Sequence, residues 1–193
     1  MLVACLVFMT SLHAGTVEVY MSNAEASYER LDIVDSMAWY RKAAEAGHVP
    51  AQVRLAYLLD NAEENDEALK WYRLAAQQED AEAEFGLARL YASGEGVERD
   101  YEQAVAWFMR AADQDYLPAI HVLALAYEKG QLGLKVDYDQ ALYWLGRGAD
   151  RQDHWSIKRL VKAYRGGELG LKYDPETASA LERTLTAATT AGP

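Results

Sequence analysis

The sequence contains little that could brace a fold covalently or mark a linker. Its single cysteine excludes an internal disulfide, so the fold must be stabilised by burial alone. Proline occurs 4 times in 193 residues, which is too sparse for a linker-rich protein. The chain is nevertheless 51% hydrophobic, so it can form one folded core or a short repeat array.

Basic residues are also in deficit. The chain has 19 Lys and Arg against 30 Asp and Glu, which gives a formal net charge of −11. This charge argues against non-specific binding to nucleic acids, whose phosphates attract basic proteins. We therefore expect no nucleic-acid partner, although a local basic patch is compatible with the composition.

Signatures of catalysis and of metal binding are missing as well. The sequence has no phosphate-binding loop and no G-x-S-x-G nucleophile motif. We predict no catalytic residues, no metal and no cofactor, and a hydrolase is the least favoured alternative. None of the four histidines has another His, Cys, Asp or Glu at metal-ligand spacing; they are His13, His48, His121 and His154.

The first 14 residues, MLVACLVFMTSLHA, carry no acidic or basic side chain. An apolar run that ends at a small residue, here Ala14, is typical of a secretory signal, and about 20 apolar residues would be needed to span a bilayer. We therefore expect a periplasmic or secreted protein, and no other segment is long and apolar enough to cross a membrane. One alternative is an apolar first helix in a cytoplasmic protein. Another is a lipid anchor at Cys5, because Leu2-Val3-Ala4-Cys5 resembles a lipoprotein cleavage box.

Tryptophan recurs at a nearly constant interval along the chain, and a second series keeps step with it. Two series with the same spacing indicate an internal repeat. We expect the tryptophans to pack between helices rather than to line an aromatic ligand groove. Trp39, Trp71, Trp107 and Trp144 are 32, 36 and 37 residues apart, and Leu181 follows after another 37. Ala51, Ala83, Ala119 and Ser156 have the same spacing, and Leu55, Leu87, Leu123 and Leu160 each follow four residues later.

Each repeat is predicted to form two helices. The first half has apolar residues at i, i+4 and i+8, and the second has Ala-x-x-Trp followed by small residues. The turn between the halves is nearly identical in YEKGQLGLKVDYDQALYW, from Tyr127, and YRGGELGLKYDPETASAL, from Tyr164. Its aspartates are placed to be N-caps, its glutamines to complete capping boxes and its glycines to be C-caps. The predicted caps are Asp100, Asp137 and Asp174, Gln103 and Gln140, and Gly94, Gly130 and Gly167.

These residues resemble the Sel1-like repeat, a relative of the tetratricopeptide repeat. The segment AEFGLARLYASGEGVERDYEQAVAWFMRAADQD, from Ala83, carries the family's alanine, leucine, tyrosine, glycine, aspartate and tryptophan positions in order. The resemblance covers residues 30 to 185 approximately. It departs from the family's pattern at Ala56, Ala88, Ala124 and Val161, which replace a glycine, and at Leu181, which replaces the last tryptophan.

The resemblance implies an all-α fold, an α-solenoid of stacked antiparallel helix pairs (an α/α repeat superhelix) with a concave face. Residues 1–14 are assigned to the signal, 15–185 to the solenoid and 186–193 to a frayed tail. The repeats are placed near 17–50, 51–82, 83–118, 119–155 and 156–185. Proteins of this family generally act as adaptors or scaffolds, in bacteria often in the envelope.

By analogy with tetratricopeptide repeats, partner-binding residues would lie two positions before and two after the repeated leucine of each first helix. The last repeat also concentrates basic residues, and spacing of three to four places Lys158, Lys162 and Arg165 on one helical face. We therefore expect a protein or peptide partner, with an acidic segment of it docking at these cations. A solvated charged face is the alternative at that position. The predicted partner-binding residues are Val53, Tyr57, Phe85, Arg89, His121, Leu125, Lys158, Lys162 and Arg165.

The sequence therefore favours a non-catalytic interaction scaffold of the bacterial cell envelope. The alternative of another class is a binder of a cell-wall or exopolysaccharide fragment, which tyrosine and tryptophan side chains exposed on the groove would favour. Contact with a membrane is expected only through a lipid at Cys5. No oligomeric state is predicted.

Overall fold

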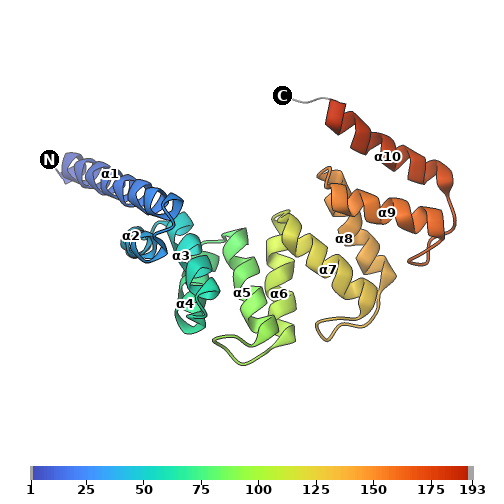
Figure 1. Ribbon diagram of the computed structural model, residues 1–193, viewed down its shortest axis with the longest axis horizontal. Coiled ribbons are helices and arrows are strands. Elements are labelled where there is room, and N and C mark those ends of the chain that lie inside the picture. The colour runs from blue at the N-terminus through green and yellow to red at the C-terminus, as the bar shows by residue number, and fades with distance from the viewer. Residues whose placement is uncertain (1, 191–193) are drawn as a thin grey trace. The chain divides into compact units, whose positions relative to one another are not determined.

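The computed structural model describes residues 2–190 and places side chains from residue 15 to residue 185. Over the described residues the fold is all-α, as predicted, with ten helices and no strand (Figure 1). The chain divides into two compact parts, an N-terminal unit of residues 1–98 and a C-terminal unit of residues 99–193. The helices pack as antiparallel pairs in succession within each unit, which is the predicted solenoid architecture.

The N-terminal unit contains the first five helices, which pack in sequence order. Helix α1 contacts α2, α2 contacts α3, α3 contacts α4, and α4 contacts α5. Helix α3 also contacts α5 directly, so the first helices of successive repeats meet. The helices are α1 (Leu2–Glu29), α2 (Ile33–Glu45), α3 (Val49–Asn61), α4 (Asn65–Ala76) and α5 (Ala81–Ser93).

The C-terminal unit contains the other five helices and repeats the same order of contacts, from α6 against α7 to α9 against α10. The last pair is closed by a small apolar cluster in which Leu181, at the position of the missing tryptophan, packs against Ile157, Val161 and Ala178. The helices are α6 (Tyr101–Asp113), α7 (Leu117–Lys129), α8 (Tyr138–Asp150), α9 (His154–Gly166) and α10 (Pro175–Thr190).

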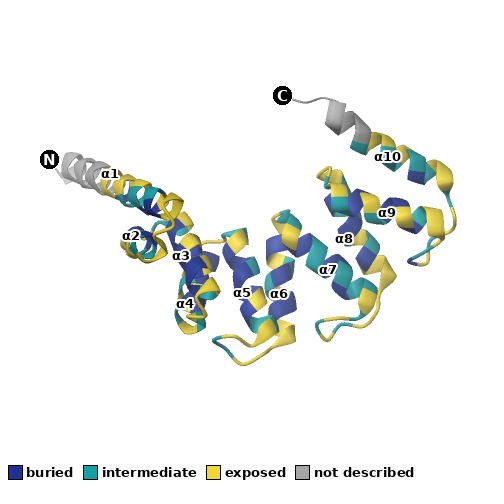
Figure 2. Ribbon diagram, in the orientation of Figure 1, coloured by how far each residue is buried: buried dark blue, intermediate teal, exposed yellow. Residues whose placement is uncertain are grey.

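Buried residues lie along the paired helices (Figure 2), and they include the repeated small residues and the leucines that follow them by four positions. Burial of small residues at one position lets two helices approach closely, and the leucines fill the space between them. The four small residues Ala51, Ala83, Ala119 and Ser156 are all 0% exposed. Of the leucines, Leu55, Leu87 and Leu123 are at most 1% exposed and Leu160 is 8% exposed.

The tryptophans lie on the second helices of the pairs and are packed rather than presented to a ligand. Trp144 is 4% exposed, and Trp39, Trp71 and Trp107 are half-buried. A cation three residues later, on the next turn, lies over the ring in three of the repeats. These pairs are Lys42 over Trp39 at 3.7 Å, Arg110 over Trp107 at 4.6 Å and Arg147 over Trp144 at 5.6 Å.

The predicted aspartate N-caps and glycine C-caps form as expected. The side chains of Asp100 and Asp137 each accept the backbone N–H three residues later, at 3.0 Å, and Asp174 accepts that of Thr177 at 3.0 Å. These bonds satisfy donors that a helix start leaves without a partner. The predicted C-caps Gly94, Gly130 and Gly167 are all in the left-handed conformation that favours glycine.

The capping-box prediction is wrong in one respect. The Asp137 N–H, which Gln140 was expected to accept, is donated to the Tyr127 carbonyl at 2.9 Å. The Asp174 N–H is likewise donated to the Tyr164 carbonyl at 2.9 Å. In these two turns the backbone therefore ties the start of the second helix, α8 or α10, to the end of the first.

Both ends of the chain continue as helix into segments that were predicted to be non-core. Helix α1 runs through the predicted signal from Leu2, and α10 continues to Thr190 within the predicted tail. The side chains of residues 1–14, which include Cys5, and of residues 186–193 lie outside the described part of the chain. Among the helices that could be searched in the described residues, none has the length and apolar content needed to cross a membrane.

Candidate functional site: a groove on the first helices of the N-terminal unit

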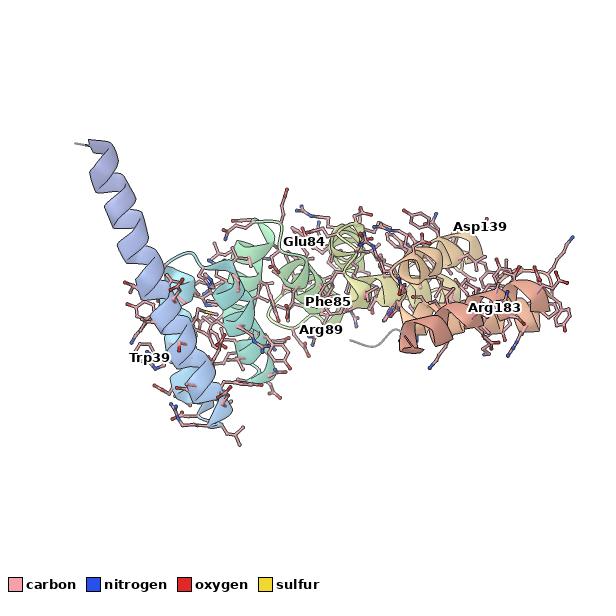
Figure 3. All side chains as sticks on the ribbon, turned by 90° about the horizontal axis from the view of Figure 1, so that it is seen from above. Trp39, Glu84, Phe85, Arg89, Asp139 and Arg183 are labelled. Carbon is pink, nitrogen blue, oxygen red and sulfur yellow. The ribbon has the colours of Figure 1, made fainter. Side chains whose placement is uncertain are left out.

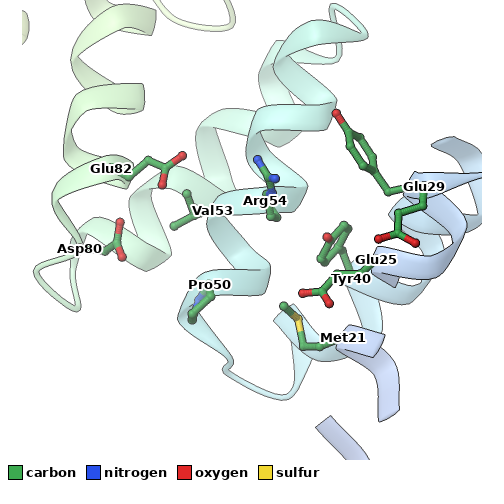
Figure 4. A pocket seen from close by; sticks show the side chains of 10 residues that line it. Met21, Glu25, Glu29, Tyr40, Pro50, Val53, Arg54, Asp80 and Glu82 are labelled. Carbon is green, nitrogen blue, oxygen red and sulfur yellow. The ribbon is translucent and has the colours of Figure 1, made fainter. Parts of the chain in front are cut away.

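A groove of about 620 Å³ opens in the N-terminal unit (Figure 4). It lies between the first helices α1, α3 and α5, with one residue from α2, and one of the predicted partner-binding residues, Val53, lines it. Its lining residues are Met21, Glu25, Tyr28, Glu29, Tyr40, Pro50, Val53, Arg54, Asp80 and Glu82.

The starts of α3 and α5 are fixed at the groove by their own caps. Asp80 accepts the Ala83 N–H at 2.9 Å, and the His48 ring accepts the Ala51 N–H at 3.3 Å. Pro50 occupies the first turn of α3, where its missing N–H costs little. Capping therefore helps to place the Asp80 carboxylate and the Pro50 ring at the groove.

Arg54 is the central side chain of the groove. It is exposed on α3, and its guanidinium carbon lies 5.9 Å from the Tyr28 ring centre and 6.0 Å from that of Tyr57. Burial raises the pKa of the Tyr40 hydroxyl, and the nearby Arg54 charge only partly offsets this rise. Three tyrosines from three helices thus surround one guanidinium, an arrangement that holds the arginine in place by cation–π attraction.

Carboxylates flank the groove on two sides. Glu25 and Glu29 come from α1, and Asp80 and Glu82 come from the start of α5 (Figure 4). The surrounding sequence has the same sign, because residues 1–98 contain 7 Lys and Arg against 17 Asp and Glu, a net charge of −10. Residues 99–193 contain 12 against 13, a net charge of −1, so nearly all of the excess acidity lies in the half of the chain that has the groove.

Four of the predicted partner-binding residues belong to this unit. Val53 is 4% exposed and lines the groove, while Tyr57 is 36% exposed and lies beside Arg54. Phe85 and Arg89 both lie on α5 (Figure 3). Phe85 is half-buried, and Arg89 lies 3.4 Å from the Asp60 carboxylate. The structure therefore places Val53 in the groove lining and Tyr57 next to the lining residue Arg54, whereas Arg89 is engaged in an ion pair with α3.

The remaining predicted residues lie in the C-terminal unit, and most of them make contacts within it. His121 is 2.8 Å from the Asp153 carboxylate, and its ring lies 4.4 Å from that of Trp155. Leu125, on the same helix, is half-buried. Asp153 also caps α9 by accepting the Ser156 N–H at 2.7 Å, so His121 supports the junction of α7 with α9.

The basic face of α9 is largely balanced by glutamates of its own unit. Lys162 lies 3.6 Å from Glu168, and Arg165 lies 2.7 Å from Glu182. Lys158 is exposed on the same helix. Because the intramolecular carboxylates offset part of the charge, α9 attracts an acidic partner less than its sequence suggests.

The ionised Asp60 carboxylate that pairs with Arg89 is unfavourably placed, because it is buried. Its side chain is only 6% exposed, and burial raises its pKa despite the opposing effect of Arg89. It also lies at the end of α3, where the helix dipole disfavours a negative charge. A raised pKa in the folded state means that ionisation of Asp60 lowers stability at any pH above its unfolded pKa of about 4.

Replacing Asp60 with asparagine is therefore expected to raise the free energy of unfolding at pH 7 by about 1 kcal/mol. The advantage over the wild type should shrink as the pH falls below about 4, because Asp60 is then neutral in both states. Urea unfolding at pH 7 and pH 3.5 measures both values. A loss of stability at pH 7 would mean instead that the pair with Arg89 outweighs burial.

Apart from Val53, the groove residues were not predicted from the sequence: they are Met21, Pro50, Tyr28, Tyr40, Arg54 and the four carboxylates. Arg54 follows the predicted residue Val53 directly in the sequence, so a predicted binding face rotated by one residue around the helix would have included Arg54. Tyr40 follows Trp39 on a second helix and Tyr28 lies on the weakly patterned α1, so neither had a local sequence signal.

Within the described residues no group of three or more His, Cys, Asp or Glu side chains could hold a metal ion.

The Sel1 repeat model of protein families matches the chain over residues 26–48, 49–80, 81–116 and 117–153, more than half of its length. The pair α9 and α10 forms a further repeat beyond the last match. A search of curated proteins found no match.

Solved structures with a similar fold include three Sel1-type proteins. A Sel1 repeat protein from Oxalobacter formigenes is 29% identical, with a TM-score of 0.74 over 92% of this chain and 74% of that one. The protective antigen c5321 of uropathogenic Escherichia coli is 26% identical, with a TM-score of 0.77 over 93% of this chain, which spans only 40% of that protein. A putative Sel1 repeat protein from Klebsiella pneumoniae is 25% identical, with a TM-score of 0.52 over 78% of this chain and 73% of that one. The repeat matches and the paired helices together show that this chain belongs to the Sel1 repeat family.

Proposed function

We propose that this protein is a non-catalytic scaffold that binds a partner protein or peptide in the groove of its N-terminal unit. Sel1 repeat proteins are commonly protein-interaction scaffolds. The observation that carries the proposal is the groove of about 620 Å³ on helices α1, α3 and α5, with Arg54 presented among tyrosines. This volume is in the range of sites that enclose a small ligand or a few side chains of a peptide.

The chemistry of the groove suits a peptide chain. Arg54 can donate hydrogen bonds to backbone carbonyls, and exposed parts of Tyr28 and Tyr57 offer ring surface at low entropic cost. Tyrosine and arginine are the residue types most often responsible for binding energy at protein interfaces. The groove needs no chemical step, because selection by shape and charge is enough for a scaffold.

An envelope location is part of this proposal. Its support is the uncharged, apolar stretch of residues 1–14 and the similarity to c5321, which is described as a protective antigen of uropathogenic Escherichia coli. Docking of an acidic segment on Lys158, Lys162 and Arg165 stays a prediction. The ion pairs of Lys162 and Arg165 with glutamates make the groove of the N-terminal unit the better-supported site.

Site-specific photo-cross-linking tests the proposal. A photoreactive phenylalanine at position 57, beside Arg54, should give a discrete protein adduct in the organism that makes this chain. The matched control is position 173, a tyrosine that is 70% exposed on the turn before α10 and should give no such adduct. Adducts of equal yield from both positions, or from position 173 alone, would contradict the groove as the binding site.

A binder of a cell-wall or exopolysaccharide fragment is the second candidate. The observation in its favour is that Tyr28 and Tyr57 are 39% and 36% exposed, so their faces could stack on sugar rings. The same experiment separates the two candidates. A heterogeneous adduct from position 57 that collapses on treatment with a glycan hydrolase would favour the polymer over a protein partner.

A further inference from the structure

We propose that the groove takes a cationic segment of the partner, one that presents lysine or arginine side chains between α1 and α5. This inference rests on the proposed function and adds the chemistry of the partner. Its starting point is the arrangement in Figure 4, where Glu25 and Glu29 lie on one side of the groove and Asp80 and Glu82 on the other. A chain laid between α1 and α5 would meet carboxylates along both edges.

The net charge around the groove determines which charge a bound segment should carry. Four carboxylates line it against one guanidinium, and the surrounding residues 1–98 carry a net charge of −10. A field of this sign acts over about 8–10 Å at physiological salt, which is comparable to the width of a groove between helices. It speeds the approach of a cationic segment and repels an acidic one.

The groove also fits the shape of long basic side chains. Met21, Pro50 and Val53 provide an apolar lining on which the methylene stem of a lysine or arginine can lie. The charged end can then reach Glu25 or Glu29 on α1, or Glu82 on α5. A charged head held by carboxylates and a stem packed on apolar atoms is the usual way in which such side chains are bound.

Two tyrosine rings already lie next to one guanidinium, so rings of this kind can also bind a cationic side chain of a partner. Arg54 lies 5.9 Å from the centre of the Tyr28 ring and 6.0 Å from that of Tyr57. Both rings remain more than one third exposed, so each has a surface left for a second cation. Arg54 also lines the groove, and a guanidinium can donate hydrogen bonds to backbone carbonyls of a bound chain.

Three synthetic peptides of 12 residues test the inference. They share eight uncharged positions and differ at the other four, which are all lysine, all glutamine or all glutamate. Fluorescence anisotropy with the full chain at 50 and 150 mM NaCl gives their dissociation constants. We expect the lysine peptide to bind at least about 30-fold more tightly than the glutamate peptide at 50 mM NaCl, and to weaken with salt.

Matched variants separate the groove from the bulk charge. The triple variant Glu25→Gln, Glu29→Gln, Glu82→Gln should weaken the lysine peptide at least about tenfold. The control triple Glu63→Gln, Glu64→Gln, Glu98→Gln removes the same charge from exposed positions that do not line the groove, and should weaken it less than about threefold. Far-ultraviolet circular dichroism confirms that both variants are folded.

The outcomes are distinguishable. If both triples weaken the lysine peptide equally, the attraction is general and the groove assignment is overturned. If the three peptides bind alike and the groove variant weakens all of them, the partner groove stands and the cationic specificity is wrong. If the lysine peptide binds no better than the glutamate peptide and neither triple changes it, the inference fails, and cross-linking from position 57 decides the proposed function separately.

Discussion

Replacing Gly86 with alanine is expected to destabilise the protein by about 3 kcal/mol, although alanine is normally the better helix former. Gly86 lies within α5, and a Cβ at this position would be 2.4 to 2.8 Å from three ring atoms of Tyr72. Tyr72 is 3% exposed on α4, so its ring has little room to move away. Chemical denaturation followed by circular dichroism measures the change.

Gly146 supplies the matched control for Gly86. It is also inside a helix, α8, but a Cβ there would meet no atom within 4 Å. Gly146→Ala should therefore stabilise the protein by up to about 1 kcal/mol, the difference in helix propensity. In the Gly86→Ala background, Tyr72→Leu should recover part of the loss, because the smaller side chain leaves space. A Gly86→Ala variant as stable as Gly146→Ala would show that α4 and α5 are not packed as described.

The second large effect is expected at Arg159, whose replacement by leucine should cost about 3 kcal/mol. Its guanidinium on α9 bonds to both oxygens of Glu128 on α7 at 3.0 and 2.9 Å, and its Nη1 forms an ion pair with Glu168 at 2.9 Å. The side chains of Arg159 and Glu128 are 14% and 17% exposed. Leucine would leave the Glu128 carboxylate nearly buried without its partner, which costs more than the pair itself contributes.

Two further variants serve as controls for the Arg159→Leu prediction. Arg165→Leu removes a pair with Glu182 whose side chains are 53% and 40% exposed, so the loss should stay below about 1 kcal/mol. The double variant Arg159→Leu, Glu128→Leu should recover most of the loss of Arg159→Leu, since no charge is then left unpaired. Equal losses for Arg159→Leu and Arg165→Leu would mean that burial does not govern these pairs.

The repeats, the caps and the buried series could be predicted because their causes are local. An aspartate three residues before the backbone N–H that it accepts, or a glycine where a helix must end, acts within one turn of chain. The spacing of Ala83 and Leu87 likewise reports the period of a single helix. Such signals recur in every repeat, so each copy supports the others.

The groove could be predicted only in part because its residues meet through space. The periodicity placed Val53 and Tyr57 on the first helix, but Tyr28 and Tyr40 reach Arg54 from α1 and α2. The basic residues of α9 gave a clear sequence pattern, yet Glu168 and Glu182 lie beside two of them. Charge on a helical face can be counted from sequence, whereas its pairing depends on how neighbouring helices pack.

Hydrogen–deuterium exchange of the full chain, with and without the partner recovered by cross-linking, tests the central claim most directly. The account predicts slower exchange on binding in the second half of α1, in α3 and at the start of α5, the helices that line the groove. It predicts no change in α9. Protection confined to α9 would contradict it, and would place the partner on the basic face of Lys158, Lys162 and Arg165 instead.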